Sequence, residues 1–196
     1  MTTPVISIIC DVYNDAAFLR QCLDGFIMQQ TSYSYEILIH DDASTDESPQ
    51  IIKEYEAKYP SVIKPIYQTE NKYSKGISIW KKYQFPRAKG KYIAICEGDD
   101  YWSDPLKLEK QITFLETHTE YTISYTKSDV FNNSLQQFED YTLGKKKKDY
   151  FDLLKSNEIP ALSVCVRTSI VREYMDKVLA YKYWIIGDYP LWLYAA

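Results

Sequence analysis

Apolar runs alternate with amphipathic stretches over the first hundred residues of the chain. The runs are continuous and rich in β-branched residues, a pattern typical of strands that are buried on both faces of a sheet. Between them, apolar residues recur every three or four positions, as in helices that bury one face. The clearest stripe is Leu19, Leu23, Phe26 and Ile27. Strands that alternate with helices predict right-handed βαβ crossovers and a mainly parallel sheet flanked by helices.

The same pattern gives approximate bounds for these elements. The expected strands are 5–10, 35–40, 62–67 and 92–96. The expected helices run to about residue 30, from the polar segment 44–46 to about residue 59, and from about 77 to 87, the last as a regular or an irregular segment that Pro86 helps to end. This alternation is the architecture of nucleotide-binding α/β domains.

The second half of the chain is less regular. A helix is expected from 104 to about 118, followed by a strand at 121–126. Residues 131–148 are polar and basic at their end, which predicts a hairpin or a mobile loop. The remaining elements are expected as a helix at 149–157, a strand at 162–166, a helix at 168–180 that Thr168 caps, and a last helix that begins at 187–190.

Composition fits a single domain with a proper core. Apolar residues make up 45% of the 196 positions, and the net charge of -4 has the wrong sign for a nucleic-acid-binding surface. No two of the four cysteines form a C-x-x-C pair, so we expect reduced core side chains.

Targeting signals are also absent from the pattern. No basic-then-apolar leader precedes the first strand, and no apolar run approaches the roughly 18 residues that a membrane-spanning helix needs. We therefore expect a cytoplasmic protein without a membrane span. Peripheral contact with a membrane stays open, because the run 190–196 reads as a helix that is cut while under way, which predicts a longer chain.

Carboxylates stand where three of the expected strands end. Asp11 follows the first strand, Asp41 and Asp42 follow the second, and the acidic segment 97–100 follows the fourth. Because parallel strands present their carboxyl ends to one ligand crevice, we expect these acids along one rim. Neighbouring carboxylates repel one another unless a cation or a hydrogen-bond donor relieves them, and such an oxygen site suits Mg²⁺ or Mn²⁺.

A single carboxylate at such a position is often only a helix cap or a turn former. We favour that interpretation for Asp15, Asp46 and Asp104, which lie close to the starts of expected helices. For Asp42 and Asp99 taken together, we favour a ligand-binding role.

Four segments carry a resemblance to a known family. They are 5–14 (VISIICDVYN), 41–46 (DDASTD), 88–102 (AKGKYIAICEGDDYW) and the Gly187-Asp188 pair ahead of an aromatic-rich helix. In this order they resemble family 2 glycosyltransferases of the GT-A fold over nearly the whole chain. The resemblance implies one α/β domain over 1–196 with a Rossmann-like, mainly parallel sheet. Its first hundred residues would bind a nucleotide-sugar, and the smaller C-terminal region 101–196 would face the acceptor.

The resemblance also implies roles for residues of a donor site. Asp42 is expected to contact the base of the nucleotide-sugar, usually uracil, and Asp11 and Tyr13 to flank the nucleotide. The family's D-x-D motif starts at Glu97 here. Asp99 would bind the Mn²⁺ or Mg²⁺ that bridges the diphosphate, and Glu97 would face the ribose or the sugar. Glu97 replaces the usual first Asp, a departure that affects the ribose or sugar contact more than the metal site.

On the acceptor side, the resemblance places the catalytic base on Asp188, with Gly187 where the family commonly has Glu. The base would deprotonate an acceptor hydroxyl as that oxygen attacks the anomeric carbon with inversion, while the metal stabilises the leaving nucleoside diphosphate. An N-cap to the last helix is the alternative role for Asp188. Tyr101 and Trp102 are expected either to form a platform for an acceptor sugar or to pack beside a helix start.

The implied function is an inverting, metal-dependent hexosyl- or hexosaminyltransferase. Its donor would be a UDP-sugar and its acceptor a glycan or lipid-linked glycan of the cell envelope, capsule or lipopolysaccharide, at the inner face of the membrane. A catalytically inactive binding module of the same fold stays open, because Glu97 and Gly187 depart from the family pattern. A nucleotidyltransferase is the other alternative, but residues 11–14 lack the Gly-rich, basic phosphate loop usual after its first strand.

Basic residues carry less specific expectations. His40 is expected to be a strand-end residue hydrogen-bonded near the nucleotide, not a metal ligand, because no second His accompanies it. Lys72, Lys75 and Arg87 are alternative phosphate contacts. The run Lys145–Lys148 is typical of a solvated face, with contact to a phosphate or an anionic acceptor as the alternative.

Overall fold

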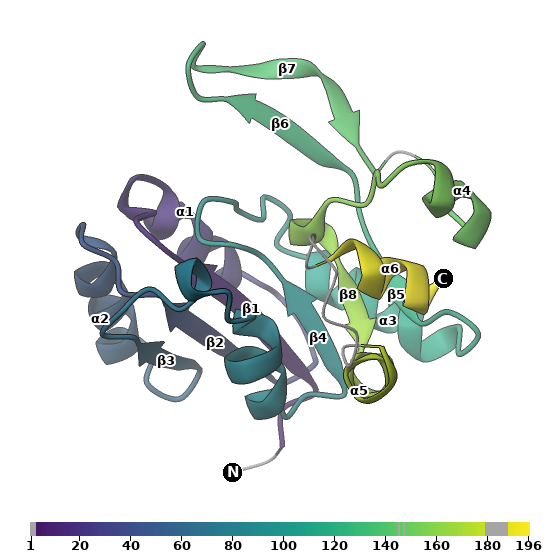
Figure 1. Cartoon of the computed structure of the whole chain (residues 1–196), viewed down its shortest axis with the longest axis horizontal. Helices are drawn as coiled ribbons and strands as arrows, with labels where there is room; N and C mark the ends of the chain where they lie inside the picture. Colours follow the sequence, from purple (N-terminus) through teal and green to yellow (C-terminus); the bar gives the residue numbers. More distant parts are fainter. Residues whose placement is uncertain (1–2, 145, 147, 179–187) are drawn as a thin grey trace.

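A twisted sheet forms the centre of the molecule (Figure 1). The computed structural model describes residues 3–144, 146, 148–178 and 188–196. Within these residues the sheet consists of β1 (Ile6–Val12), β2 (Tyr35–Asp41), β3 (Ile63–Tyr67), β4 (Tyr92–Ile95), β5 (Ile123–Ser124) and β8 (Cys165–Arg167). Their spatial order is β3-β2-β1-β4-β8-β5. The first four run parallel, and β8 is antiparallel to both β4 and β5, so the predicted α/β fold with a mainly parallel sheet is confirmed.

Helices cover both faces of this sheet. One face packs against α1 (Ala16–Ile27), α2 (Ser48–Lys58) and α3 (Lys107–Thr117), and the other against the short helices η2 (Trp80–Gln84) and η3 (Phe85–Arg87) with α5 (Thr168–Lys177) and α6 (Tyr189–Ala195). The helices α1 and α2 are the crossover connections of two parallel strand pairs, as the βαβ pattern predicts. Among the described helices, none combines the length and the apolar composition that a membrane span requires.

Successive residues of the central strands point into opposite cores. In β1, Ile8 and Cys10 join the core on the side of α1, whereas Ile9 joins the core on the side of α5. In β4, Ala94 and Ile95 divide in the same way. Both faces are therefore buried, which explains why these strands read as continuous apolar runs. All four cysteines are buried and free, as predicted.

Two predicted elements differ in detail from those observed, whereas the segment 77–87 takes the irregular form that was one of its two expected forms. The segment expected at 77–87 is an irregular helix, a π-helical turn at Trp80–Gln84 followed by a 3₁₀ turn at Phe85–Arg87. The strand expected at 162–166 begins only at Cys165, because a 3₁₀ turn (Ala161–Ser163) precedes it. Thr168 does not cap α5; its hydroxyl instead donates to the carbonyl of Gly90 at 2.7 Å.

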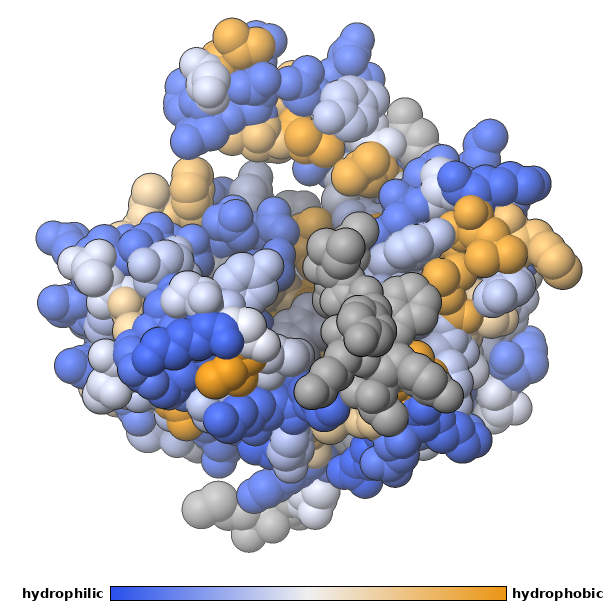
Figure 2. Space-filling view, in the orientation of Figure 1, coloured by the Kyte–Doolittle hydropathy of each residue, from blue (hydrophilic) through white to orange (hydrophobic). Residues whose placement is uncertain are grey.

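A separate hairpin projects from the body beside α4 (Tyr150–Lys155) (Figure 1). It consists of β6 (Ser128–Asn132) and β7 (Gln137–Leu143), so the hairpin predicted within 131–148 exists but starts earlier. Apolar side chains gather on the hairpin and on α4 (Figure 2). The exposed ones are Phe131, Leu135, Phe138, Tyr141, Leu143, Tyr150, Phe151 and Leu154. This part of the chain therefore adds little to the common core.

Candidate active site

A cleft of about 1070 Å³ opens at the carboxyl ends of β1, β2 and β4. Residues 71–81 form one wall, and Ala161, Tyr174 and Asp188 contribute to another. The residues predicted for the site that line it are Asp11, Tyr13, Asp42, Glu97, Asp99 and Asp188. The sheet topology thus brings together side chains from both halves of the chain, as expected for the strand ends of an open α/β sheet.

A glycine lets the acidic loop after β4 approach the end of β1. The Gly98 amide donates to the carbonyl of Asp11 at 3.0 Å. A Cβ at position 98 would lie 2.7 Å from Oδ2 of Asp15 and 3.1 Å from Cγ2 of Val12. A side chain at position 98 would push the Asp15 carboxyl group aside, so a glycine at the middle of the 97–99 motif suits this packing.

Three carboxylates of this loop form the group that fits a metal ion. Ligand oxygens of Glu97, Asp99 and Asp100 all lie within 4.8 Å of one another. Partial burial, and then the charge of Asp99, raise the pKa of Glu97 to about 7 and that of Asp100 to about 6. Although Glu97 is exposed on the rim, the cleft walls desolvate its carboxyl group. An all-oxygen donor set with this mutual repulsion suits a hard divalent cation such as Mn²⁺ or Mg²⁺.

Two further carboxylates from β1 and the loop after it face the same space. Burial raises the pKa of Asp11 to about 7, although a hydrogen bond from Gln84 to Asp11 opposes this effect. Burial also raises the pKa of Asp15 to about 6, and the charge of Asp99 adds to it. Asp15 was expected to be a helix cap or a turn former. Its side chain makes no cap hydrogen bond to α1 and accepts from the amide of Tyr13 at 3.0 Å, a contact within the turn after β1. Its position four residues after Asp11 at the same strand end was the available signal.

The loops that follow β1 and β2 are hydrogen-bonded to each other. Asn14 has a φ of 60°. Its backbone amide donates to the Ser44 hydroxyl at 2.9 Å, and its side-chain Oδ1 accepts from the backbone amide of Thr45 at 2.8 Å. Asp46 accepts from the amide of Ala16 at 2.9 Å, at the start of α1. The two sequence motifs 5–14 and 41–46 therefore form one structural unit at the rim of the cleft.

Asp42 holds one wall of the cleft in position. Its two carboxylate oxygens accept from the backbone amides of Lys72 at 2.8 Å and Tyr73 at 2.9 Å. The side chain is 4% exposed, and both amides begin the 3₁₀ turn Tyr73–Lys75. In this conformation Asp42 fixes the loop of residues 71–76 above the end of β2.

Asp188 lies at the start of α6, and Gly187 lies outside the described residues. Oδ1 of Asp188 accepts from the Tyr189 amide at 2.7 Å, which bears out the N-cap interpretation. Within the described residues, Oδ2 has no hydrogen-bond partner. The charge of Asp188 contributes to the raised pKa of Glu97, which places the two carboxyl groups on the same cleft.

His40 is fully buried at the end of β2. Its Nε2 lies 3.1 Å from Nε2 of Gln68, and its ring packs 5.0 Å from that of Tyr83. Burial lowers its pKa to about 4, so the ring is neutral at pH 7. These contacts fit a strand-end residue and not a metal ligand.

Trp102 packs in the core and not on the cleft. The side chain is 3% exposed, its Nε1 donates to the carbonyl of Leu162 at 2.7 Å, and its ring contacts Phe26 edge-on at 4.8 Å. The expectation that it forms an acceptor platform is therefore corrected in favour of packing. Tyr101 is half-buried and does not line the cleft.

The lysines and the arginine considered for phosphate contact point elsewhere. Lys72 and Lys75 both pair with Glu70, Lys72 at 2.6 Å. The guanidinium of Arg87 donates to backbone carbonyls of β2 and β3. Lys81, which the sequence did not single out, is the lysine of this segment that lines the cleft.

The lysine run at 145–148 is described only in part, because residues 145 and 147 lie outside the described residues. Nζ of Lys148 lies 3.0 Å from a carboxylate oxygen of Glu158. The carbonyl of Lys146 accepts from the Tyr125 hydroxyl at 2.6 Å. The described part of the run is therefore bonded to the protein itself.

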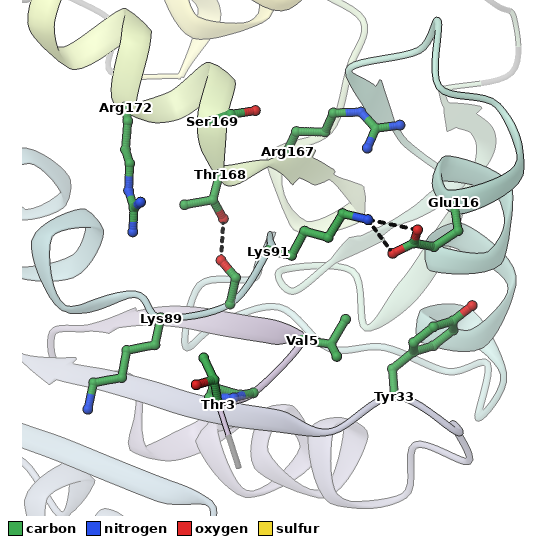
Figure 3. Close-up of a pocket in the computed structure, with 12 residues that line it drawn as sticks. Thr3, Val5, Tyr33, Lys89, Lys91, Glu116, Arg167, Thr168, Ser169 and Arg172 are labelled. Carbon is green, nitrogen blue, oxygen red and sulfur yellow. Dashed lines mark hydrogen bonds and ion pairs between the residues drawn. The ribbon is translucent and has the colours of Figure 1, made fainter.

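A second hollow, of about 610 Å³, lies at the opposite end of the sheet (Figure 3). Its lining contains the ion pair of Lys91 with Glu116, in which Nζ is 2.8 Å from both carboxylate oxygens. The Thr168 hydroxyl in the same lining bonds to the Gly90 carbonyl. These polar groups are satisfied within the fold.

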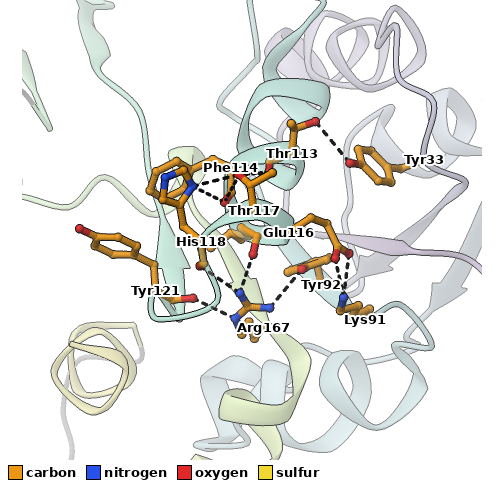
Figure 4. A network of polar contacts seen from close by, with 11 residues as sticks. Tyr33, Lys91, Tyr92, Thr113, Phe114, Glu116, Thr117, His118, Tyr121 and Arg167 are labelled. Atoms are coloured by element: carbon orange, nitrogen blue, oxygen red, sulfur yellow. Dashed lines mark hydrogen bonds and ion pairs between the residues drawn. The ribbon is translucent and has the colours of Figure 1, made fainter.

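Arg167, which also lines this second hollow, joins three elements (Figure 4). It donates to the carbonyls of Leu115 at 2.6 Å and Tyr121 at 2.9 Å and to the Tyr92 hydroxyl at 3.1 Å. The positive charge of the guanidinium thereby interacts favourably with carbonyls at the C-terminal end of α3. We assign a structural role to this end of the sheet and place the candidate active site in the cleft.

The chain matches the sequence model of a known family. A sequence model described as glycosyl transferase family 2 matches residues 7–177. The chain therefore belongs to glycosyl transferase family 2. The matched range contains the segments 41–46 and 88–102 and most of 5–14, whereas the Gly187-Asp188 pair lies beyond it.

The family 2 relatives of the chain are mostly longer proteins. An uncharacterized protein of Mycobacterium tuberculosis is 45% identical over 120 residues, which are 61% of this chain and 34% of that protein. The putative glycosyltransferase EpsE of Bacillus subtilis is 37% identical over 129 residues, 66% of this chain and 45% of EpsE. The putative teichuronic acid biosynthesis glycosyltransferase TuaG of Bacillus subtilis is 28% identical over 163 residues, 83% of this chain and 62% of TuaG. The chain thus spans 34% of the length of the first of these relatives.

Solved structures share the fold. The crystal structure of residues 1–349 of S. aureus TarS in complex with UDP matches with a TM-score of 0.61 at 20% identity, over 86% of this chain and 48% of that one. The mannosyltransferase PcManGT from Pyrobaculum calidifontis, in complex with GDP-Man and Mn²⁺, matches with a TM-score of 0.60 at 17% identity, over 88% and 47%. At these identities the likeness establishes the fold alone, which is the GT-A fold expected of family 2.

Proposed function

We propose that this chain is the catalytic domain of an inverting, metal-dependent glycosyltransferase that transfers a hexosyl or hexosaminyl unit from a UDP-sugar to a hydroxyl of a cell-envelope glycan. The observation that carries the proposal is the single cleft in which Asp11, Glu97, Asp99 and Asp188 converge. The first hundred residues supply the donor side of this cleft, and Asp188 supplies the acceptor side.

The comparisons support the choice of ligands. TarS was solved with UDP and with UDP-GlcNAc, and PcManGT with a nucleotide-sugar and Mn²⁺. TuaG is named for teichuronic acid biosynthesis, which supports a cell-envelope glycan as the acceptor class here. An acceptor that is lipid-linked would bring the protein to the inner face of the membrane, consistent with a chain in which no described helix could span it.

On the donor side, Asp99 would hold the cation, with Glu97 and Asp100 as the neighbouring oxygens. When bound, the divalent ion would neutralise the charge that builds up on the leaving diphosphate. Asp11 and Tyr13 line the cleft beside the loop that Asp42 fixes, a position suited to flank the nucleotide. Carboxylates at the end of a parallel strand can accept hydrogen bonds from an imide or from ribose hydroxyls.

On the acceptor side, Asp188 would act as the general base. Its Oδ1 is held by the Tyr189 amide, which fixes the orientation of the carboxylate. Oδ2 would take the proton of the acceptor hydroxyl as that oxygen attacks the anomeric carbon. A base on one side of the cleft and acidic metal ligands on the other suit an in-line displacement with inversion.

The first test is calorimetric titration of UDP with and without Mn²⁺, on the wild type and on Asp99→Ala. We expect Mn²⁺ to strengthen UDP binding and the substitution to remove most of that gain, by at least the roughly 10–100-fold that the loss of even an outer-sphere partner costs a metal site. Asp176→Ala, an exposed position on α5 outside the cleft, is the matched control and should bind as the wild type does.

The outcomes separate the alternatives. Absence of UDP binding with and without Mn²⁺ would reject the UDP-sugar donor. UDP binding without any hydrolysis of UDP-sugars in the presence of Mn²⁺ would instead favour the inactive binding module, for which the departures at Glu97 and Gly187 leave room.

A further inference from the structure

The side chain of Gln84 occupies a fully buried position directly beneath the cleft. It belongs to the π-helical turn Trp80–Gln84, and its exposed fraction is 0%. Its Nε2 donates to Oδ1 of Asp11 at 2.7 Å, the shortest of three contacts that this nitrogen makes. The other two are to the carbonyls of Cys10 at 3.1 Å and Leu38 at 3.2 Å, in β1 and β2.

Arg87 determines which way the Gln84 amide points. Oε1 of Gln84 accepts from Nε of Arg87 at 3.2 Å and from its Nη2 at 3.0 Å. A guanidinium can only donate, so the carbonyl oxygen of the amide must face Arg87 and the NH₂ group must face Asp11. The usual ambiguity between the two ends of a glutamine side chain is therefore resolved by chemistry.

Arg87 is itself anchored to the sheet. Its Nη1 donates to the carbonyl of Lys64 at 3.0 Å and its Nη2 to the carbonyl of Ile39 at 2.7 Å. Its charge also acts favourably on Asp11 across the intervening amide. A chain of contacts thus runs from the backbone of β2 and β3 through Arg87 and Gln84 to a carboxylate that lines the cleft.

We infer that Gln84 is a positioning residue for donor binding: its amide, held by Arg87, orients the Asp11 carboxylate toward the nucleotide. This inference rests on the proposed function and names residues that the sequence motifs do not include. Trp80 and Lys81 of the same π-helical turn, and Ile79 just before it, also line the cleft wall. Widened helical turns of this kind occur frequently at functional sites.

A packing role alone does not account for this arrangement. A buried carboxylate costs free energy unless donors satisfy it, and an apolar side chain at position 84 beside an apolar side chain at position 11 would fill the same space without that cost. The segment thus supplies, through Gln84, a donor that keeps one cleft-facing carboxylate ordered.

The test compares UDP binding in the presence of Mn²⁺ for the full chain carrying Gln84→Leu and for a matched control, Gln29→Leu. Gln29 is another buried glutamine, 8% exposed, whose amide bonds to the carbonyls of Gly25 and Asp104 away from the cleft. We expect Gln84→Leu to weaken UDP binding by about tenfold or more, the loss expected when a hydrogen bond to a charged group is removed. Gln29→Leu should lower thermal stability and leave the dissociation constant unchanged.

A double substitution separates positioning from general damage. If Gln84 acts through Asp11, adding Gln84→Leu to Asp11→Asn should weaken UDP binding no further, whereas independent effects would multiply. Gln84→Glu keeps the size of the side chain and its contact with Arg87 but replaces the donor by an acceptor. It should weaken UDP binding to the same extent, and it serves as the test variant if Gln84→Leu does not fold.

Three results would overturn the inference. Unchanged UDP binding in Gln84→Leu would reject it and leave the proposed function intact, as would independent losses in the double variant. Absence of UDP binding by the wild type would reject the proposed function and the inference with it.

Discussion

The charged side chains at the two ends of the central sheet differ in how far the protein itself satisfies them. At the amino end of β4, Lys91 pairs with both oxygens of Glu116, and Arg167 is satisfied by backbone carbonyls and a tyrosine hydroxyl. At the carboxyl end, burial and neighbouring acids raise the pKa values of Asp11 and Glu97 to about 7. At the amino end, these charged side chains are therefore paired within the fold. At the carboxyl end, the carboxyl groups have raised pKa values even where a described residue donates a hydrogen bond to them.

This difference supports the cleft as the proposed active site. Buried polar groups that serve only the fold are normally satisfied within it, whereas carboxyl groups with raised pKa values concentrate at functional sites. The cleft therefore carries an electrostatic cost that a divalent cation and a ligand would relieve. In the hollow at the other end, Lys91 is paired with Glu116, and Arg167 donates to backbone carbonyls and to the Tyr92 hydroxyl.

The largest expected effect is that of Asp188→Asn at the cleft. Asparagine keeps an oxygen that can accept from the Tyr189 amide, so α6 should remain capped, but it cannot take a proton. We expect UDP binding to be unchanged and sugar transfer to fall by about 10²–10⁴-fold, the usual contribution of a general base. Calorimetry and a transfer assay on the same preparation check both parts. A collapse of UDP binding would instead make Asp188 part of the donor site.

A medium effect is expected at the opposite end of the sheet. Arg167→Leu removes hydrogen bonds to the carbonyls of Leu115 and Tyr121, and the loss of such charge-assisted bonds costs about 2–4 kcal/mol of unfolding free energy in sum. Chemical denaturation measures this loss. The dissociation constant for UDP should not change in the folded variant; a parallel loss of UDP binding would show that the two ends of the sheet are not separate in function.

Much of the fold and the rim of the cleft could be predicted from the sequence because their signals are local. Runs such as residues 92–96 are continuous and apolar because both faces of the strand are buried, and the acids at 97–100 stand at the end of the same run. Asp11 and Asp42 follow the same logic on neighbouring strands. The parallel order of these strands then places all of them on one edge.

The remaining features depend on contacts between distant segments. Gln84 and Arg87 lie in an irregular helix without periodicity. Nothing in the local sequence therefore distinguishes Gln84 from a surface glutamine, or shows that Arg87 donates to a carbonyl of β2. Trp102 follows the acidic loop directly in sequence, yet the chain turns its ring into the core against Phe26. Asp15 had the signature of a helix cap or a turn former, and only the assembled structure shows that it also lines the cleft beside Gly98.

The smallest expected effects test whether ionisation of a carboxyl group lowers stability at one end of the sheet and raises it at the other. In the unfolded chain Asp11 ionises above about pH 4, but in the folded protein only above about pH 7. Its ionisation therefore costs stability progressively as the pH rises from about 4 through about 7. The amide that Asp11→Asn introduces carries no charge at any of these pH values. The variant should therefore melt a few degrees above the wild type at pH 8, with the gain shrinking toward pH 4.

Glu116→Gln provides the opposite case. The hydrogen bond from Lys91 lowers the pKa of Glu116, so this carboxylate contributes stability above its unfolded pKa that is lost as the pH falls through its folded pKa. The substitution should therefore lower the melting temperature at pH 8, and only slightly, because exposed ion pairs are worth roughly 0–1 kcal/mol. Thermal melts of both variants at pH 4, 6 and 8 check the pair. A melting temperature of Asp11→Asn at or below that of the wild type at pH 8 would mean that the Asp11 carboxyl group is relieved within the protein itself.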